Sequence, residues 1–186
     1  MADEWEWDEM GKMMMKWFVV LCLAGALQIH AEGLSLESTG VRGAFSNPAK
    51  HARYYQVEGY LNSNLPWRWD YESGWHIQTR VDLTAGWMNG RGEDAFVGTV
   101  GPSFELSWDK IPLTLDVGSS PTILSRDEFG HTDFGTLFQF TTHAGLTWKI
   151  GSHASVGCRF QHMSNAGIGS SNPGVNMSSF GLGWRF

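Results

Sequence analysis

Residues 75–87 read Trp-His-Ile-Gln-Thr-Arg-Val-Asp-Leu-Thr-Ala-Gly-Trp, and this stretch decides the fold. Successive side chains of a β-strand point to opposite faces, so every second residue shares a face. One face is mostly apolar and carries tryptophan at both ends: Trp75, Ile77, Thr79, Val81, Leu83, Ala85 and Trp87. The other face is polar and holds charges in mid-strand: Gln78, Arg80, Asp82 and Thr84. This period of two predicts a long strand rather than a helix.

Two further segments repeat the alternation. One sets an apolar face against a polar one as follows: Phe96, Val100, Phe104, Leu106 and Trp108 against Thr99, Ser103, Glu105 and Ser107. The other does the same: Phe138, Phe140, Ala144, Leu146, Trp148 and Ile150 against Gln139, Thr141, His143, Thr147 and Lys149. Strands of soluble sandwiches usually run about 5–6 residues, whereas strands of about 10 residues with one apolar face are typical of transmembrane barrels. In lipid, only a closed barrel leaves no strand edge unpaired.

The whole pattern predicts an all-β fold: an eight-stranded antiparallel transmembrane β-barrel of the bacterial outer membrane, spanning residues 32–186. The expected strands are 34–47, 53–62, 75–87, 95–108, 111–122, 135–150, 153–164 and 175–186. Side chains fill the interior of a barrel of this size. We therefore expect the inward-facing charged residues to pair with one another as structure: Arg80, Asp82, Glu105, Asp116 and Arg159.

The connections between strands indicate which end faces outward, because outer-membrane barrels have short periplasmic turns and longer outer loops. Asp109–Lys110 and Gly151–Ser152 are short, whereas 88–94, 118–134 and 165–174 are longer connections. The last strand then runs toward the periplasm.

The first 31 residues are typical of a cleaved signal peptide rather than of the fold. Lys12 and Lys16 precede an apolar run over 17–27, which is shorter than the about 20 residues that a membrane-spanning helix needs. A small residue, Ala31, stands at the expected cleavage point. An uncleaved N-terminal anchor is the alternative, and translation that begins at one of Met13 to Met15 would remove the atypical acidic start.

Composition narrows the choice of partners and cofactors. The formal net charge of −6 argues against a nucleic-acid partner. Of the two cysteines, Cys22 lies in the expected signal peptide and Cys158 stands alone after it, so no intrachain disulfide is expected. No cluster of His, Cys or carboxylate residues has metal-ligand spacing, and we expect neither a metal nor another cofactor.

The strand at 153–164 carries two polar residues where the apolar face should continue. Val156, Cys158 and Phe160 share a face with His162 and Ser164, at the outer end of the strand. A polar pair at this place either caps the apolar band at the membrane interface or does chemistry. The spacing alone is a weak motif.

The longer stretch His162-Met163-Ser164-Asn165-Ala166-Gly167-Ile168, followed by Asn172-Pro173-Gly174, resembles the PagL family of lipid A 3-O-deacylases. These outer-membrane hydrolases remove an ester-linked 3-hydroxy acyl chain from lipid A. The resemblance implies a carboxylic ester hydrolase in which Ser164 is the nucleophile and His162 its general base. It also implies an oxyanion hole formed by the Asn165 side chain and the Gly167 backbone N–H.

One position departs from the family's pattern. The family places a Glu fourteen residues after the histidine, where this chain has Asn176, on the outward face of the last strand. An Asn can accept the imidazole N–H and hold the tautomer, but it cannot neutralise the imidazolium. Carboxylates in the long loop are alternative acids, and a histidine there is a spare base: Asp127, Glu128, Asp133 and His131.

The expected substrate and partners are lipid A (lipopolysaccharide) and outer-membrane lipid, and the sequence leaves open whether the chain forms a homodimer. The competing interpretation is a non-catalytic barrel. That barrel would be a structural or adhesin-like membrane protein, or an inactive relic of a deacylase that lost its acid.

Overall fold

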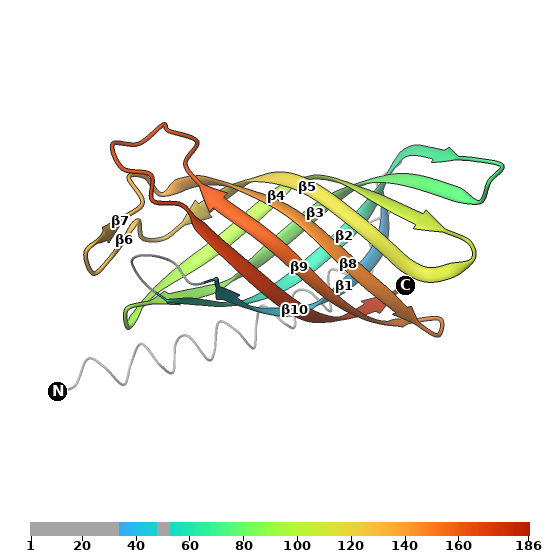
Figure 1. Ribbon diagram of the computed structural model, residues 1–186, viewed down its shortest axis with the longest axis horizontal. Helices are drawn as coiled ribbons and strands as arrows, with labels where there is room; N and C mark the ends of the chain where they lie inside the picture. Colours follow the sequence, from blue (N-terminus) through green and yellow to red (C-terminus); the bar gives the residue numbers. More distant parts are fainter. Residues whose placement is uncertain (1–33, 48–52) are drawn as a thin grey trace.

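The computed structural model describes residues 34–47 and 53–186, and these form a closed antiparallel barrel (Figure 1). Its eight strands are β1 (Ser35–Ser46), β2 (Tyr54–Asp70), β3 (Trp75–Gly90), β4 (Glu93–Trp108), β5 (Ile111–Leu124), β8 (Phe138–Ile150), β9 (Ala154–Ser164) and β10 (Val175–Arg185). β1 pairs with β10 and closes the sheet. The predicted eight-stranded barrel is therefore confirmed. The expected signal peptide, 1–31, lies outside the described residues.

A short hairpin, β6 (Glu128–Phe129) with β7 (Thr132–Asp133), rises from the long connection between β5 and β8. In the part of the chain that the structure describes, no helix is long and apolar enough to cross a membrane. The beginning of β1 and the end of β10 lie side by side. They are at the end of the barrel that carries the short turns Asp109–Lys110 and Gly151–Ser152. In outer-membrane barrels that end faces the periplasm.

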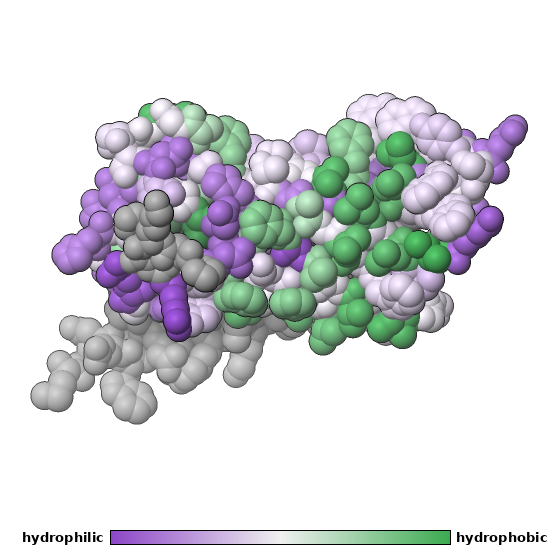
Figure 2. Space-filling view, viewed as in Figure 1, coloured by the Kyte–Doolittle hydropathy of each residue, from purple (hydrophilic) through white to green (hydrophobic). Residues whose placement is uncertain are grey.

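Apolar side chains cover the outside of the barrel. Leu182 is 64% exposed and Val57 is 61% exposed. Exposure of such apolar side chains is unfavourable in water but not among lipid tails. On the face that Figure 2 shows, apolar residues gather over the middle of the barrel and toward the end with the short turns, and the more polar residues lie at the two ends. Aromatic rings border the band at the periplasmic end, where Trp75 stacks on Trp108 with ring centroids 5.4 Å apart. Such a band with aromatic edges is the mark of a barrel in a bilayer.

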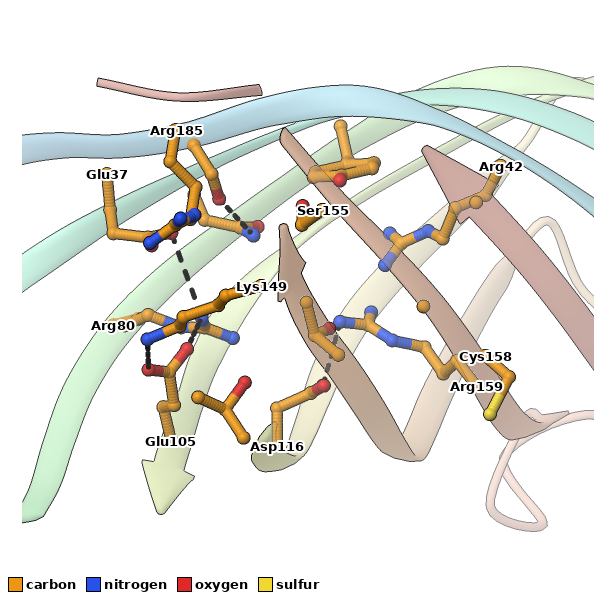
Figure 3. A pocket seen from close by; sticks show the side chains of 17 residues that line it. Glu37, Arg42, Arg80, Glu105, Asp116, Lys149, Ser155, Cys158, Arg159 and Arg185 are labelled. Atoms are coloured by element: carbon orange, nitrogen blue, oxygen red, sulfur yellow. Dashed lines mark hydrogen bonds and ion pairs between the residues drawn. The ribbon is translucent and has the colours of Figure 1, made fainter. Parts of the chain in front are cut away.

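Charged residues inside the barrel pair with one another, as predicted. Arg80 bonds Glu105 at 2.5 Å, and Arg159 bonds Asp116 at 2.8 Å. Figure 3 shows these pairs reaching across the interior from different strands. Nearer the outer end, Arg42 bonds Glu58 at 2.8 Å. A buried charge is costly unless it is paired, so this network makes the interior a packed structure rather than a pore.

An apolar cluster fills the extracellular end of the barrel; we call it the plug. Phe129 and Phe134, from the β6–β7 segment, are almost fully buried and meet Tyr54 edge to face. The plug consists of Ala44, Tyr54, Met88, Ala95, Val97, Leu124, Phe129, Phe134, Met163, Val175 and Met177. The segment after β5 therefore folds inward and closes the interior from above.

Three boundaries differ from the sequence-based prediction by three residues or more. β2 runs to Asp70 rather than ending at 62, with its pairing to β3 interrupted between Asn64 and Arg68. β8 begins at Phe138 rather than at 135. The predicted outer loop 88–94 is instead a two-residue turn, Arg91–Gly92, in which both residues have positive φ. Two such residues suit the tight hairpin turn that matches strand twist.

Candidate active site

The predicted site residues alternate along their strands with members of the plug. His162 and Asn176 point outward and are exposed, while Met163 and Met177, next to them in the chain, are buried in the plug. Since successive side chains of a strand point to opposite faces, each outward residue is held by a neighbour packed inside. The plug thus fixes the backbone beneath the candidate site, and the site lies on the lipid-facing outside of the barrel.

The structure brings His162 and Asn176 together. They are directly opposite each other in the β9–β10 ladder, and His162 Nδ1 lies 2.7 Å from Asn176 Oδ1. An amide oxygen can only accept, so this bond requires a hydrogen on Nδ1 and leaves Nε2 free to take a proton. Gly174 lies against the ring, because a Cβ there would come within 3.1 Å of His162 Cε1. The histidine is therefore held in the tautomer that a general base needs.

Ser164 follows His162 on the same face, at the outer end of β9. It is half-buried and stands opposite Phe140 of β8. Among the described residues, no hydrogen bond joins its hydroxyl to His162, a contact that in free enzymes often forms only when substrate binds. The structure thus places the candidate nucleophile and base on one face, in adjacent outward positions.

The chain turns sharply immediately after Ser164. Ile168 N donates to Asn165 O at 3.1 Å, and the two residues between them have positive φ: 54° at Ala166 and 81° at Gly167. Glycine adopts this conformation freely, but alanine does so at a cost of about 1–3 kcal/mol. Such strain persists only where the surroundings hold the backbone, so this turn is rigidly supported.

Asn165 supplies that support, and it is completely buried. Its Nδ2 donates to Phe134 O at 2.8 Å and to Ser171 O at 2.7 Å, and its Oδ1 accepts the Gly167 N–H at 2.8 Å. The side chain has no hydrogen left to give to an oxyanion. The oxyanion-hole role expected for the Asn165 side chain does not fit this conformation, because the amide joins the turn to the plug segment instead. The Gly167 N–H, also expected there, is engaged by the same amide.

We predict that Asn165→Ala will loosen the loop over 165–174. The substitution removes the donor to Ser171 O and the acceptor of the Gly167 N–H, and it leaves Phe134 O with only the 3.4 Å bond from Gln139 Nε2. A buried polar group left unpaired costs about 1–3 kcal/mol, so limited proteolysis should cleave this loop about tenfold faster. Asn172→Ala is the matched control. Asn172 is exposed, and the substitution removes only the bond in which its Oδ1 accepts the Asn165 N–H at 3.2 Å. Unchanged cleavage of the Asn165 variant, with activity lost, would contradict the supporting role.

Among the described residues, none of the alternative acids Asp127, Glu128 and Asp133 is hydrogen-bonded to His162. Within residues 34–47 and 53–186, Asn176 is the residue whose side chain bonds His162. Asp133 accepts the Gly135 N–H in its own loop, and Glu128 is exposed on the β6–β7 hairpin. His131, the spare base, is exposed at the turn of that hairpin.

One interior cluster combines residue types that bind metals. The ligand atoms of Asp82, Asp116 and His143 lie within 4.8 Å of one another, and all three residues are buried. However, the Arg159 guanidinium already lies 2.8 Å from Asp116 and 3.5 Å from Asp82. This cation supplies the positive charge that the two carboxylates need, so the cluster is an ion network rather than a fitting metal site.

Comparison with known proteins identifies relatives of this chain. The profile of the family described as lipid A 3-O-deacylase (PagL) matches residues 53–185. Lipid A deacylase PagL of Bordetella bronchiseptica is 28% identical over 134 residues, covering 68% of this chain and 74% of that protein. Lipid A deacylase PagL of Pseudomonas aeruginosa is 27% identical over 176 residues, covering 89% of this chain and 96% of that protein.

Solved structures agree in fold. The crystal structure of the outer membrane enzyme PagL matches with a TM-score of 0.63 and 22% identity, covering 81% of this chain and 98% of that one. Neisserial surface protein A matches with a TM-score of 0.53 and 14% identity, covering 83% and 98%. At these identities, the solved structures support the barrel fold alone. Because the family profile covers most of the sequence, this chain belongs to the lipid A 3-O-deacylase (PagL) family of outer-membrane proteins.

Proposed function

We propose that this chain is an active lipid A 3-O-deacylase, a serine esterase that hydrolyses the ester at position 3 of lipid A and releases a 3-hydroxy acyl chain. The observation that carries the proposal is the bond of 2.7 Å between His162 Nδ1 and Asn176 Oδ1 on the outward face beside Ser164. The proposal includes export through the expected signal peptide, 1–31, and a mature barrel over 32–186.

The proposed reaction proceeds in two steps. The Ser164 hydroxyl attacks the ester carbonyl carbon while His162 Nε2 takes its proton, since a serine hydroxyl is scarcely ionised at neutral pH. The tetrahedral intermediate breaks its bond to the sugar oxygen, which leaves with the proton from His162, and the acyl chain stays on Ser164. A water molecule then attacks the acyl ester with the same base and releases the fatty acid.

The oxyanion of this intermediate needs a donor beside Ser164. We assign this role to the Gly167 N–H, which would exchange its bond with Asn165 Oδ1 for one with the substrate oxygen. A backbone donor of this kind is typical of oxyanion holes. Asn165 contributes by holding the turn.

The location of the site supports a substrate that arrives within the membrane. The plug and the ion network fill the interior, so the lumen offers no path for a lipid. His162 and Ser164 are instead reached from the outside, near the extracellular end of the apolar band. A lipid of the outer leaflet could diffuse laterally to this place and present its ester without leaving the bilayer.

Mass spectrometry of lipid A tests the proposal. Expression of the chain in a bacterial host without such an enzyme should produce lipid A lighter by one 3-hydroxy acyl group, together with the free 3-hydroxy fatty acid. Unchanged lipid A, with the barrel present and folded in the outer membrane, would favour the non-catalytic or relic interpretation, for which the amide at Asn176 is the main support.

A further inference from the structure

A row of polar side chains crosses the lipid-facing surface beside the candidate site. In the sheet register, Asn176 of β10 is opposite His162 of β9, His162 is opposite Thr142 of β8, and Thr142 is opposite Ser119 of β5. All four side chains are exposed on the outside of the barrel. The first two belong to the site already described. Thr142 and Ser119 have no role in it.

The surroundings of these two hydroxyls are apolar. On the extracellular side the next outward residues of the same strands are Phe140 and Pro121, and on the periplasmic side they are Ala144 and Val117. A hydroxyl facing hydrocarbon is costly unless it is hydrogen-bonded. Thr142 Oγ1 and Ser119 Oγ lie 3.1 Å apart, so one bonds the other. That bond uses one hydroxyl hydrogen, and the second remains available to a ligand, together with unused acceptor positions.

The slant of the strands places the pair deeper in the membrane than His162. Partners in an antiparallel ladder lie on a line perpendicular to the strands. In Figure 1, β10, β9 and β8 slant across the barrel, so a line from β10 through β9 to β8 moves toward the periplasmic end. The row therefore begins at Asn176 near the outer surface and descends past His162 to Thr142 and Ser119. An acyl chain held at Ser164 descends in the same direction, into the hydrocarbon.

We propose that Thr142 and Ser119 bind the 3-hydroxyl of the acyl chain that the enzyme removes. This inference rests on the proposed deacylase function. The 3-hydroxyl is on the carbon two bonds from the carbonyl that Ser164 attacks, so it lies on the first part of the chain below the ester. Thr142 is the cross-strand neighbour of His162, at a Cβ separation of about 5 Å. The pair makes the site selective for 3-hydroxylated chains over unsubstituted ones.

Two synthetic substrates test the inference directly. They are monosaccharide lipid A analogues that differ only at the position-3 ester, which carries either a 3-hydroxy chain or an unsubstituted chain of equal length. The wild-type protein in detergent should prefer the hydroxylated ester by about tenfold in kcat/KM, as one or two neutral hydrogen bonds provide. The double variant Ser119→Ala with Thr142→Val keeps the shape but removes both hydroxyls, and its preference should fall to about one.

Thr39→Val is the matched control. Thr39 also faces outward, on β1, but its hydroxyl bonds Tyr60 O at 2.8 Å and lies outside the row, so its removal should leave the preference intact. A double variant that keeps the tenfold preference overturns the inference, and so does one that slows both substrates equally. If the wild-type protein hydrolyses neither substrate, the proposed function itself fails, and the inference falls with it. Heat-dependent gel mobility verifies that each variant is folded.

Discussion

Ser164→Ala and His162→Ala should each reduce lipid A deacylation by about 10⁴-fold or more. In serine hydrolases the nucleophile and its base act as one unit, so removal of either loses nearly the whole contribution of both. Here the two side chains are neighbours on one face, and the Nδ1 bond of His162 leaves Nε2 as the proton acceptor. Release of 3-hydroxy fatty acid from purified lipid A, followed by mass spectrometry, measures the loss.

These variants should fold normally, because both positions lie on the outside of the barrel while the plug packs on the inside. Ser178→Ala is the matched control: its hydroxyl, on β10 two residues beyond Asn176, bonds Asn47 Oδ1 at 3.0 Å, and its loss should leave the rate near that of the wild type. Near-normal activity of Ser164→Ala would remove it as the nucleophile. Chelators should have no effect on the wild type, since the reaction as proposed uses no metal.

Most of the barrel could be predicted from alternation alone. A strand in a bilayer must keep one face apolar, so a one-residue error in register would reverse every side chain, and the sequence specifies the register strongly. The stretch at 75–87 shows this: Arg80 and Asp82 are buried inside, while Leu83 and Trp87 are exposed. The same period placed His162 and Asn176 on the outward face, where the structure has them.

The extension of β2 could not be predicted in this way. Residues 63–70 include Pro66, which lacks an N–H and interrupts a ladder. The ladder to β3 shifts at this point, and side chains of β3 satisfy the freed carbonyls instead: Gln78 donates to Leu65 O and Thr79 to Trp67 O, each at 2.7 Å. These replacement hydrogen bonds come from a neighbouring strand, so no local pattern in the sequence of residues 63–70 indicates them.

The plug and the role of Asn165 also could not be predicted from the sequence. Phe129 and Phe134 lie in a segment without periodicity, and nothing near them indicates that they turn into the barrel. The bond from Asn165 to Phe134 O joins residues 31 positions apart. Glycines at the contact permit it, since a Cβ on Gly135 would lie 2.2 Å from Ser171 O. Such loop-to-loop packing appears only in three dimensions, whereas the family resemblance assigned Asn165 by position alone.

Replacing the amide of Asn176 by a carboxylate should raise activity. Hydrogen bonds to charged groups contribute about 1.5–3 kcal/mol, against about 0.5–1.5 kcal/mol for neutral ones. The difference corresponds to a rate increase of about tenfold, provided that the imidazolium forms in the transition state. Asn176→Asp is the sharpest variant, because its carboxylate can place an oxygen where Oδ1 now lies, 2.7 Å from His162 Nδ1. Asn176→Glu supplies the acid that the family has at this position.

Asn176→Ala should act in the opposite direction. It removes the acceptor that fixes the Nδ1–H tautomer, so activity should fall about tenfold, and the alanine and aspartate variants should differ by about 10²-fold. An acid-to-amide exchange in the serine protease template costs about 10⁴-fold, chiefly through the wrong tautomer. Here the amide already accepts from Nδ1, so the tautomer is correct and only the charge is missing. The smaller expected gain follows from that difference.

The pH dependence separates this role from a structural one. A carboxylate beside the ring favours the protonated imidazole, which cannot act as a base. The rise of activity with pH should therefore begin at higher pH in Asn176→Asp than in the wild type, while Asn176→Ala should show no such upward displacement. Rates of lipid A deacylation across pH, in matched detergent, measure this for all three proteins. If the three rates and profiles coincide, Asn176 does not orient His162, and the charge that stabilises the imidazolium must come from the substrate or its lipid surroundings.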